Sequence, residues 1–439
     1  MNTMSTIRDC APHTDEQSSF GIVKALLTVI IAVLIGVLSS PWMYTNDTPP
    51  AYRIPIFACM IAMIFVLSVG RIGKLSKQKL TMLFLWSGFA SMALVSGLLT
   101  DEDILAVLWL SLGVPYLLFC VFPQAAGRHG NVMVLMAIVL GLAPYVAASL
   151  ILYPLNGRYF GVFTNPNGFG VTVVTMSAAL LGLLRGAISA TNKNVIHWLW
   201  ISILWIMVGA AFPLIVLSNS RTSLITYVVL MMIFVGSLFF NRHKNRWWIT
   251  ISAIIVLGAV AVFLVSGLSN DVYNSFFGRI IDKMETKAQS GDISGGRFKI
   301  WESVLSQVEL FGKGSIGFPQ KFGGLAHNTY IMVLGATGPL ALGFLIAIHG
   351  FTVFIGFKMV TRNIRRDGYA VGPLLVILNY IVLGLAETVY GFLGNGINMS
   401  FLLMTGVLVH ENWAEEVSLE SAENRPMKPM PQIVEGEIR

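Results

Sequence analysis

Long apolar runs recur along the chain, with short polar segments between them. Most runs approach the roughly 20 apolar residues that an α-helix needs to cross a bilayer. They predict about twelve transmembrane helices, nine before a long polar segment and three after it. The predicted spans are residues 20–40, 53–70, 80–98, 104–122, 132–153, 168–189, 195–217, 222–240, 247–268, 339–360, 371–389 and 394–410.

The polar segment between the ninth and tenth spans, residues 269–325, has a pattern of its own. Apolar residues recur at helical spacing over residues 297–311, which predicts an amphipathic helix in the membrane interface or over the membrane domain. Residues 328–337 are apolar but too few to span, which predicts a half-helix or a re-entrant segment on the outer side. The predicted domains are an N-terminal tail (1–19), nine spans (20–268), a large loop (269–338), three spans (339–410) and a disordered C-terminal tail (411–439).

Composition agrees with an all-α polytopic membrane protein. Of the 439 residues, 55% are hydrophobic and 12% are charged, whereas a soluble domain has about 25% charged residues. The mean hydropathy is +0.73. The net charge of +7 does not indicate a nucleic-acid-binding protein, because that function needs a basic soluble surface and the positive residues here lie in loops between spans.

The loops between the predicted spans alternate in charge. The loops 71–79, 241–246 and 358–366 are basic, whereas the loop 100–103 is acidic. Because positive residues concentrate in cytoplasmic loops, the even-numbered loops and both termini are predicted to be cytoplasmic. The large loop 269–338 is then on the outer side. The basic residues of the three loops are Arg71, Lys74, Lys77, Lys79, Arg242, Lys244, Arg246, Lys358, Arg362, Arg365 and Arg366.

His327 is the histidine that this topology places on the outer face, just before the half-helix. Histidine accepts a proton near neutral pH, so His327 is a candidate general base. The alternative is a polar residue beside a helix cap or at the membrane interface. Position alone leaves both interpretations open.

Three arginines lie at the outer ends of different spans, where the charge bias of membrane loops disfavours them. Arg158, Arg221 and Arg297 each stand among glycine, serine or asparagine residues. Guanidinium groups bind phosphate through bidentate hydrogen bonds, so the three predict a site for a lipid-linked phosphate or pyrophosphate. The alternative for any one of them is contact with lipid headgroups, or a pair with an acidic residue such as Glu387.

The sequence predicts neither a metal site nor a cofactor. Asp101, Glu102 and Asp103 are acidic in a row, but no further ligand is near them in sequence. A solvated helix cap is therefore the better interpretation than a divalent-ion site. The chain has no phosphate-binding loop, dinucleotide fingerprint or serine-nucleophile motif, so ATP hydrolysis is not expected.

Five short motifs follow one another on the predicted outer side. They are Phe163-Thr164-Asn165-Pro166-Asn167-Gly168 after Arg158, Ser218-Asn219-Ser220-Arg221, Gly296-Arg297 with Trp301, Gly312-Lys313-Gly314, and His327-Asn328 before Gly338. In this order the chain resembles the O-antigen ligase and O-antigen polymerase superfamily of bacterial membrane glycosyltransferases. The resemblance extends from about Arg158 to Glu387.

The resemblance implies a GT-C-type fold and glycan transfer at the periplasmic face of the bacterial inner membrane. The implied donor is a glycan on undecaprenyl pyrophosphate, and the implied reaction uses no ATP, cofactor or metal. His327 would deprotonate the acceptor hydroxyl, which attacks the anomeric carbon with inversion, while arginines hold the pyrophosphate. The implied substrate-binding residues are Arg158, Arg221, Arg297, Asn165, Asn167 and Asn328.

Ligases and polymerases differ in the acceptor. A ligase transfers the finished glycan to lipid A-core, whereas a polymerase transfers it to another lipid-linked repeat unit. His327, ten further residues and then Gly338 resemble the ligase pattern, so a ligase is favoured and a polymerase is the alternative. A transporter of an anionic lipid or sugar is a third candidate. A transporter should carry ionisable residues near the bilayer midplane, for which His349 and Arg185 are the only candidates, and Arg185 lies near a cytoplasmic end; this scarcity disfavours transport.

Overall fold

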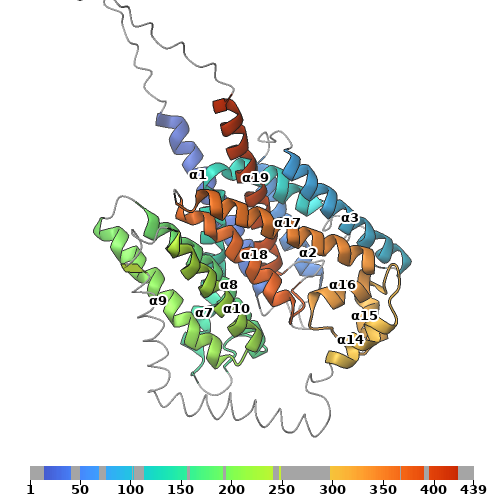
Figure 1. The fold of residues 1–439 in the computed structure, drawn as a ribbon. Coiled ribbons are helices and arrows are strands. Elements are labelled where there is room, and N and C mark those ends of the chain that lie inside the picture. Colours follow the sequence, from blue (N-terminus) through green and yellow to red (C-terminus); the bar gives the residue numbers. More distant parts are fainter. Residues whose placement is uncertain are drawn as a thin grey trace, which may run out of the picture.

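The structure is a computed structural model that describes residues 14–40, 50–68, 76–100, 102, 113–155, 159–190, 194–240, 247–248, 297–365, 367–389 and 395–423. These residues form helices joined by turns, with no strand among them. Figure 1 shows a bundle of long helices with a cluster of shorter ones against one end. A helix satisfies its backbone hydrogen bonds within one segment, as a lipid surrounding requires.

Seven of the described helices are long and apolar enough to cross a membrane. They are α1 (Thr14–Ser39), α3 (Lys77–Leu99), α7 (Gly130–Leu152), α8 (Pro166–Ser189), α9 (Val195–Leu217), α10 (Arg221–Phe239) and α17 (Pro339–Asn363). The remaining described helices are α2 (Pro50–Ser68), α5 (Val114–Tyr116), η3 (Leu117–Val121), α6 (Phe122–Ala126), η4 (Gly127–His129), α14 (Arg297–Ser306), α15 (Gly314–Phe322), α16 (Thr329–Thr337), η6 (Gly368–Val371), α18 (Gly372–Gly384) and α19 (Gly396–Glu423).

The all-helical membrane class is confirmed, whereas the number of spans stays a prediction. Seven predicted spans coincide with the seven long apolar helices. Three shorter apolar helices, Val114–Ala126, Gly368–Gly384 and Gly396–His410, occupy parts of three further predicted spans. The ninth predicted span, 247–268, lies outside the described residues except for its first two positions.

Helix α8 is the centre of the bundle. Its most apolar 18 residues are all buried, against 39% to 50% in the other six candidate spans. Helices α7, α9, α10 and α18 pack around it (Figure 1). Small residues permit this close approach, since a carbon added to Gly182 would lie 2.9 Å from the Cα of Gly372 on α18. Such small-residue contacts hold helices together in lipid.

Residues 297–338 form a small unit, called the cap below. Helices α14, α15 and α16 enclose six buried apolar residues, which are Val304, Phe318, Phe322, Ala326, Leu334 and Ala336. The cap packs against α3 and α17 (Figure 1). The Ser96 hydroxyl of α3 donates to the Ala336 carbonyl oxygen at 2.7 Å, and this bond fixes the end of α16. The stretch predicted to be a half-helix is α16.

Two helices end earlier than predicted. Helix α14 stops at Ser306 instead of residue 311, where Gln307 N–H donates to the Val304 carbonyl in a tight turn. Of its apolar residues only Val304 is fully buried, so little packing favours a longer helix. Helix α18 stops at Gly384 instead of residue 389. The N–H groups of Leu385 and Ala386 donate to carbonyl oxygens three residues earlier, as in the tighter last turn of many helices.

Helix α19 is longer than predicted. It continues to Glu423, whereas the last span was expected to end at residue 410 and a disordered tail to follow. The added residues are rich in glutamate and alanine, which are good helix formers. Residues 424–439 of the predicted tail lie outside the described residues.

The two ends of the bundle carry different side chains. Helices α1, α3 and α18 finish at one end, where α8, α10 and α19 begin; this is called the site end below. Basic residues gather at the other, the basic end. They include Lys24, Lys79, Arg185, Lys358 and Arg362. Figure 1 shows the start of α1 and the finish of α19 at the basic end. Arg221, Arg297, Lys299, Lys313 and Lys321 lie at the site end or in the cap, so the side of the membrane that each end faces stays a prediction.

Candidate active site

Asn165 forms the start of α8. Its backbone is extended, and its Oδ1 accepts a hydrogen bond from the Gly168 N–H at 2.8 Å. Pro166 occupies the first helical position, where its missing N–H costs nothing. The asparagine-proline pair in the sequence is thus a helix start, and it fixes where Asn167 lies. Asn165 itself is exposed at the site end.

Asn328 forms the start of α16 in the same way. Its Oδ1 accepts hydrogen bonds from the N–H groups of Tyr330 and Ile331 at 2.9 and 3.0 Å. Its Nδ2 donates to the Leu385 carbonyl oxygen at 2.7 Å, just beyond α18. With both ends of its amide engaged and the residue buried, Asn328 shapes the site by joining the cap to α18.

Thr329 makes a second link between these segments. Its buried hydroxyl donates to the Glu387 carbonyl oxygen at 3.0 Å and accepts from the Val389 N–H at 3.1 Å. A hydroxyl that both donates and accepts fixes the backbone on each side of it. The turn after α18 is therefore fastened to the start of α16, and Glu387 lies within that turn.

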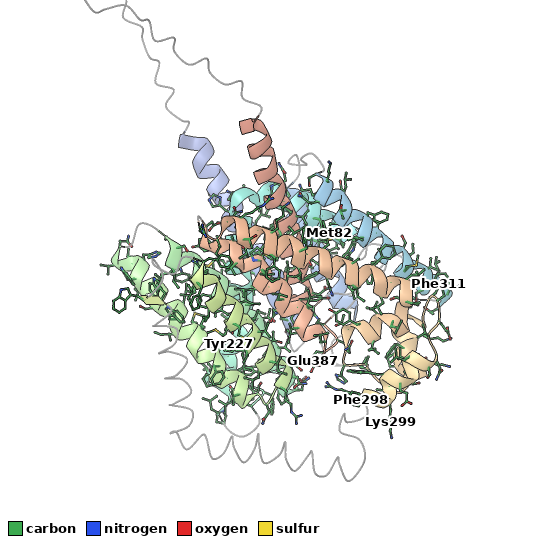
Figure 2. All side chains as sticks on the ribbon, viewed as in Figure 1. Met82, Tyr227, Phe298, Lys299, Phe311 and Glu387 are labelled. Carbon is green, nitrogen blue, oxygen red and sulfur yellow. The ribbon has the colours of Figure 1, made fainter. Side chains whose placement is uncertain are left out.

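The Glu387 carboxylate is where the predicted residues meet. Its Oε1 accepts a hydrogen bond from Asn167 Nδ2 at 2.9 Å. His327 Nδ1 lies 3.5 Å from Oε2, and Arg297 Nη2 lies 3.9 Å from Oε1. The side chains of His327, Arg297 and Glu387 are 45%, 32% and 16% exposed, so the carboxylate is the innermost member. Figure 2 shows Glu387 at the end of α18, towards Phe298 of α14.

Helix α14 holds Arg297 and the chain before His327 in place. Arg297 Nη1 donates to the Ala386 carbonyl oxygen at 3.1 Å. The Trp301 indole N–H, one turn further on, donates to the Ala326 carbonyl oxygen at 2.7 Å. These bonds connect α14 both to the turn after α18 and to the residue before His327.

A cavity of about 270 Å³ lies next to the Glu387 carboxylate, between the starts of α8 and α19. Its polar lining includes Thr164, Asn165, Asn167, Glu387, Thr388 and Asn395. Amide and hydroxyl groups of this kind can bind a hydroxyl-rich ligand. The cavity extends the candidate site from Glu387 towards α1 and α19.

Arg297 is the only one of the three predicted arginines that the structure shows in the cluster. Arg221 begins α10, is exposed, and makes no hydrogen bond or ion pair with a described residue. It lies at the site end, since Gly170 near the start of α8 packs against Ser220 just before it. Arg158 lies outside the described residues. Of the two arginines that the structure describes, Arg297 has the acidic partner, Glu387, that the alternative interpretation named.

Glu102, the one residue of the acidic cluster that the structure describes, has a different role from either interpretation of the sequence. Glu102 Oε1 accepts hydrogen bonds from the Ser315 hydroxyl at 3.0 Å and the Ile316 N–H at 2.9 Å. It therefore caps α15, a distant helix of the cap, instead of standing solvated at a nearby helix. Asp101 and Asp103 lie outside the described residues. No group of three or more metal-ligating side chains occurs among the residues that the structure describes.

The ionisable residues inside the bundle have local partners. His349 Nδ1 lies 3.0 Å from the Tyr330 hydroxyl, and burial raises the pKa of Tyr330 to about 12, so this phenol stays neutral. Arg185, near the basic end, donates to the hydroxyls of Ser189 and Ser237. Among the residues that the structure describes, these contacts are local and do not join into a relay of ionisable groups across the bundle.

The sequence named most of this cluster but not its centre. Glu387 was only one possible counter-ion for an arginine, and Thr329 and Trp301 had no assigned contact. The one signal available was a lone carboxylate at the outer end of an apolar span, where an ionisable residue is costly without a function. Its contact with His327 depends on how α18 packs against the cap.

Residues 203–346 match the family model described as O-antigen ligase. The matched residues lie within the stretch, from about Arg158 to Glu387, over which the sequence motifs resemble this family. The match includes Arg221, Arg297, His327 and Asn328, whereas Asn167 and Glu387 lie outside it. No curated protein matches the chain closely enough to count as a relative.

Proposed function

We propose, because residues 203–346 match the O-antigen ligase family, that this protein transfers a glycan from undecaprenyl pyrophosphate to lipid A-core. The observation that carries the proposal is the cluster of His327, Arg297 and Asn167 around Glu387. A proton acceptor and an anion-binding group lie within reach of one substrate, as acid–base transfer to an acceptor hydroxyl requires.

His327 is the proposed general base. Its Nδ1 faces Glu387, which leaves Nε2 for the acceptor hydroxyl. As the proton moves to Nε2, the acceptor oxygen forms a bond to the anomeric carbon and the bond from that carbon to pyrophosphate breaks. Undecaprenyl pyrophosphate leaves with the bonding electron pair, and attack from the opposite side inverts the configuration. The imidazolium then releases its proton to solvent.

The arginines are assigned to the leaving group. The Arg297 guanidinium is one-third exposed beside the proposed base, and Arg221 is exposed at the start of α10. Guanidinium groups bind phosphate oxygens bidentately and stabilise the charge that develops as pyrophosphate departs. Arg158 is assigned to the same role on the sequence resemblance alone. The exposed Asn165 amide and the neighbouring cavity are assigned to the glycan.

The orientation of the protein in the membrane is assigned from the distribution of charge. Basic residues favour the cytoplasmic side of a membrane protein, so the basic end and the two termini are assigned to the cytoplasm of the bacterium. The site end then faces the periplasm.

The test is transfer by the purified protein in detergent, without ATP, from undecaprenyl-pyrophosphate glycan. Lipid A-core and a second lipid-linked repeat unit are supplied in separate reactions. Product on lipid A-core is expected, whereas elongation of the lipid-linked glycan alone would identify a polymerase. His327→Ala should lower the rate at least about 100-fold, the usual contribution of a general base.

A matched control is His129→Ala, since His129 is exposed at the basic end and contacts Lys24 there. This variant should keep wild-type transfer. Full activity of His327→Ala would show that His327 is not the general base. Absence of product from folded wild-type protein with both acceptors would reject the transferase.

A further inference from the structure

The segments that carry His327 and Glu387 are fastened to each other by three hydrogen bonds. Asn328 Nδ2 reaches the Leu385 carbonyl, and the Thr329 hydroxyl bonds to both the Glu387 carbonyl and the Val389 N–H. The two residues that follow His327 thus both bond directly to the turn that contains Glu387. The distance between the imidazole and the carboxylate is therefore set by the backbone.

The backbone of His327 is also constrained. Its φ is +47°, in the left-handed region that a side chain with a Cβ disfavours. A residue in this conformation costs on the order of 1 kcal/mol and persists where neighbouring contacts determine it. The Trp301 bond to Ala326 before it and the Asn328 cap after it supply those contacts. The constraint fixes the direction of the Cα–Cβ bond of His327, and in this conformation its Nδ1 lies 3.5 Å from Glu387 Oε2.

The Glu387 carboxylate is oriented from its other side by α8. Asn167 donates to Oε1 at 2.9 Å, and Asn167 stands on the first turn of the most buried helix of the bundle. With Oε1 held there, Oε2 is the oxygen 3.5 Å from His327 Nδ1. Arg297 is 3.9 Å away, beyond hydrogen-bond distance, so most of its N–H groups are available to an anion.

We propose that Glu387 is a positioning residue that acts through His327. The inference rests on the proposed function, and Glu387 lies outside the residues that match the family. A carboxylate at Nδ1 favours the tautomer with the proton on Nδ1, which leaves the Nε2 lone pair for the acceptor hydroxyl. Once Nε2 holds the acceptor's proton, the same carboxylate stabilises the imidazolium. Asn167 orients Glu387, and so α8 acts on the base through two side chains.

The test compares Glu387→Gln and Glu387→Asp in the transfer assay. The glutamine variant keeps an oxygen for Asn167 but faces Nδ1 with an N–H donor, which favours the wrong tautomer. Its kcat should fall about 100-fold, with a donor KM within about twofold of wild type. The aspartate variant keeps the charge and should recover a substantial part of the lost kcat. Glu309→Gln, an exposed glutamate of the cap, should match wild type.

A double variant separates positioning from a purely structural role. If Glu387 acts through the imidazole, Glu387→Gln should change the residual rate of His327→Ala by less than about threefold, because residues that act as a unit are not additive. An additional 100-fold loss in that background would overturn the inference. A change confined to the donor KM would overturn it too, and would make Glu387 a counter-ion for Arg297.

The outcomes also distinguish this inference from the proposed function. If wild-type protein transfers the glycan and Glu387→Gln transfers it at the same rate, the positioning role is rejected and the transferase proposal stands. Transfer by His327→Ala that is lost in Glu387→Gln would make Glu387 the base and reject the positioning role. Absence of transfer by wild type would reject both. Melting temperature in detergent, measured for each variant, excludes loss of folding as the cause.

Discussion

Helix α8 and the cap are held in place by different forces. The most apolar 18 residues of α8 are all buried among neighbouring helices, whereas the cap has only six residues in its apolar core. In lipid, close packing rather than removal from water stabilises a central helix. The cap instead depends on single hydrogen bonds, such as that from Ser96 to Ala336 and that from Ile316 to Glu102.

The site combines side chains from both regions. Asn167 comes from the tightly packed helix, whereas His327 and Arg297 come from the cap, and Glu387 stands between them. Helix α8 therefore provides a fixed reference, and the cap brings the reactive side chains to it. Changes of volume should therefore damage the α8 region, while changes of hydrogen bonding or backbone shape should damage the cap.

The largest effect is expected where the cap meets α17. Gly338 has a φ of +92°, which glycine adopts freely and other residues do not. A Cβ there would also lie against the Leu310 carbonyl, closer than two atoms can approach. Gly338→Ala should cost at least about 3 kcal/mol and abolish transfer, measured by thermal unfolding in detergent and by the assay.

The control for that substitution is Gly343→Ala. Gly343 lies one turn into α17, and a Cβ there would meet no atom within 4 Å. Alanine is the better helix former, so stability should stay equal or rise slightly. If Gly338→Ala had the same melting temperature and transfer rate as this control, the cap would not depend on its junction with α17.

A smaller effect is expected from a cavity in α8. Leu180 is fully buried near the middle of this helix. In a soluble protein Leu→Ala costs about 2–5 kcal/mol, but part of that is transfer from water. A lipid surrounding removes this part, so Leu180→Ala should cost about 2 kcal/mol of packing. The kcat of the folded protein should stay within about twofold of wild type, because the site end is distant.

The matched control is Ile206→Ala on α9, whose side chain is 70% exposed on the outside of the bundle. It should change the melting temperature little. Equal losses of melting temperature in the two variants would mean that α8 is no more tightly packed than its neighbours.

The sequence predicted the long helices well because their boundaries depend on local hydrophobicity. The predicted span 195–217 has the bounds of α9, and the predicted span 168–189 starts two residues after α8 begins. It was less successful where tertiary contacts decide. The early end of α18 places Glu387 in a turn, and nothing local to that stretch of sequence marks the His327 side chain as its neighbour.

The hydrogen bond from α3 to the cap gives a third prediction. Ser96 is buried, and its hydroxyl donates to the Ala336 carbonyl in the last turn of α16, where no intrahelical partner remains. Ser96→Ala leaves that oxygen unsatisfied, at a cost of about 1 kcal/mol. Ser91→Ala is the control, since Ser91 is exposed on the same helix and bonds only to its own turn. Protease cleavage within the cap should increase in the Ser96 variant alone.

The smallest effect is expected at the exposed edge of the cap. Lys313 and Glu309 form an ion pair at 2.6 Å, with side chains 35% and 46% exposed. An exposed pair contributes about 0–1 kcal/mol, because water and salt screen it and two long side chains lose freedom. The Lys313 N–H donates to the Gly335 carbonyl at 2.9 Å whatever the side chain. Lys313→Gln, Glu309→Gln and the double variant should therefore unfold within about 0.5 kcal/mol of wild type, with no measurable coupling. A coupling above about 1 kcal/mol, measured at low salt and at 0.5 M salt, would show that charge pairs as well as buried hydrogen bonds stabilise the cap.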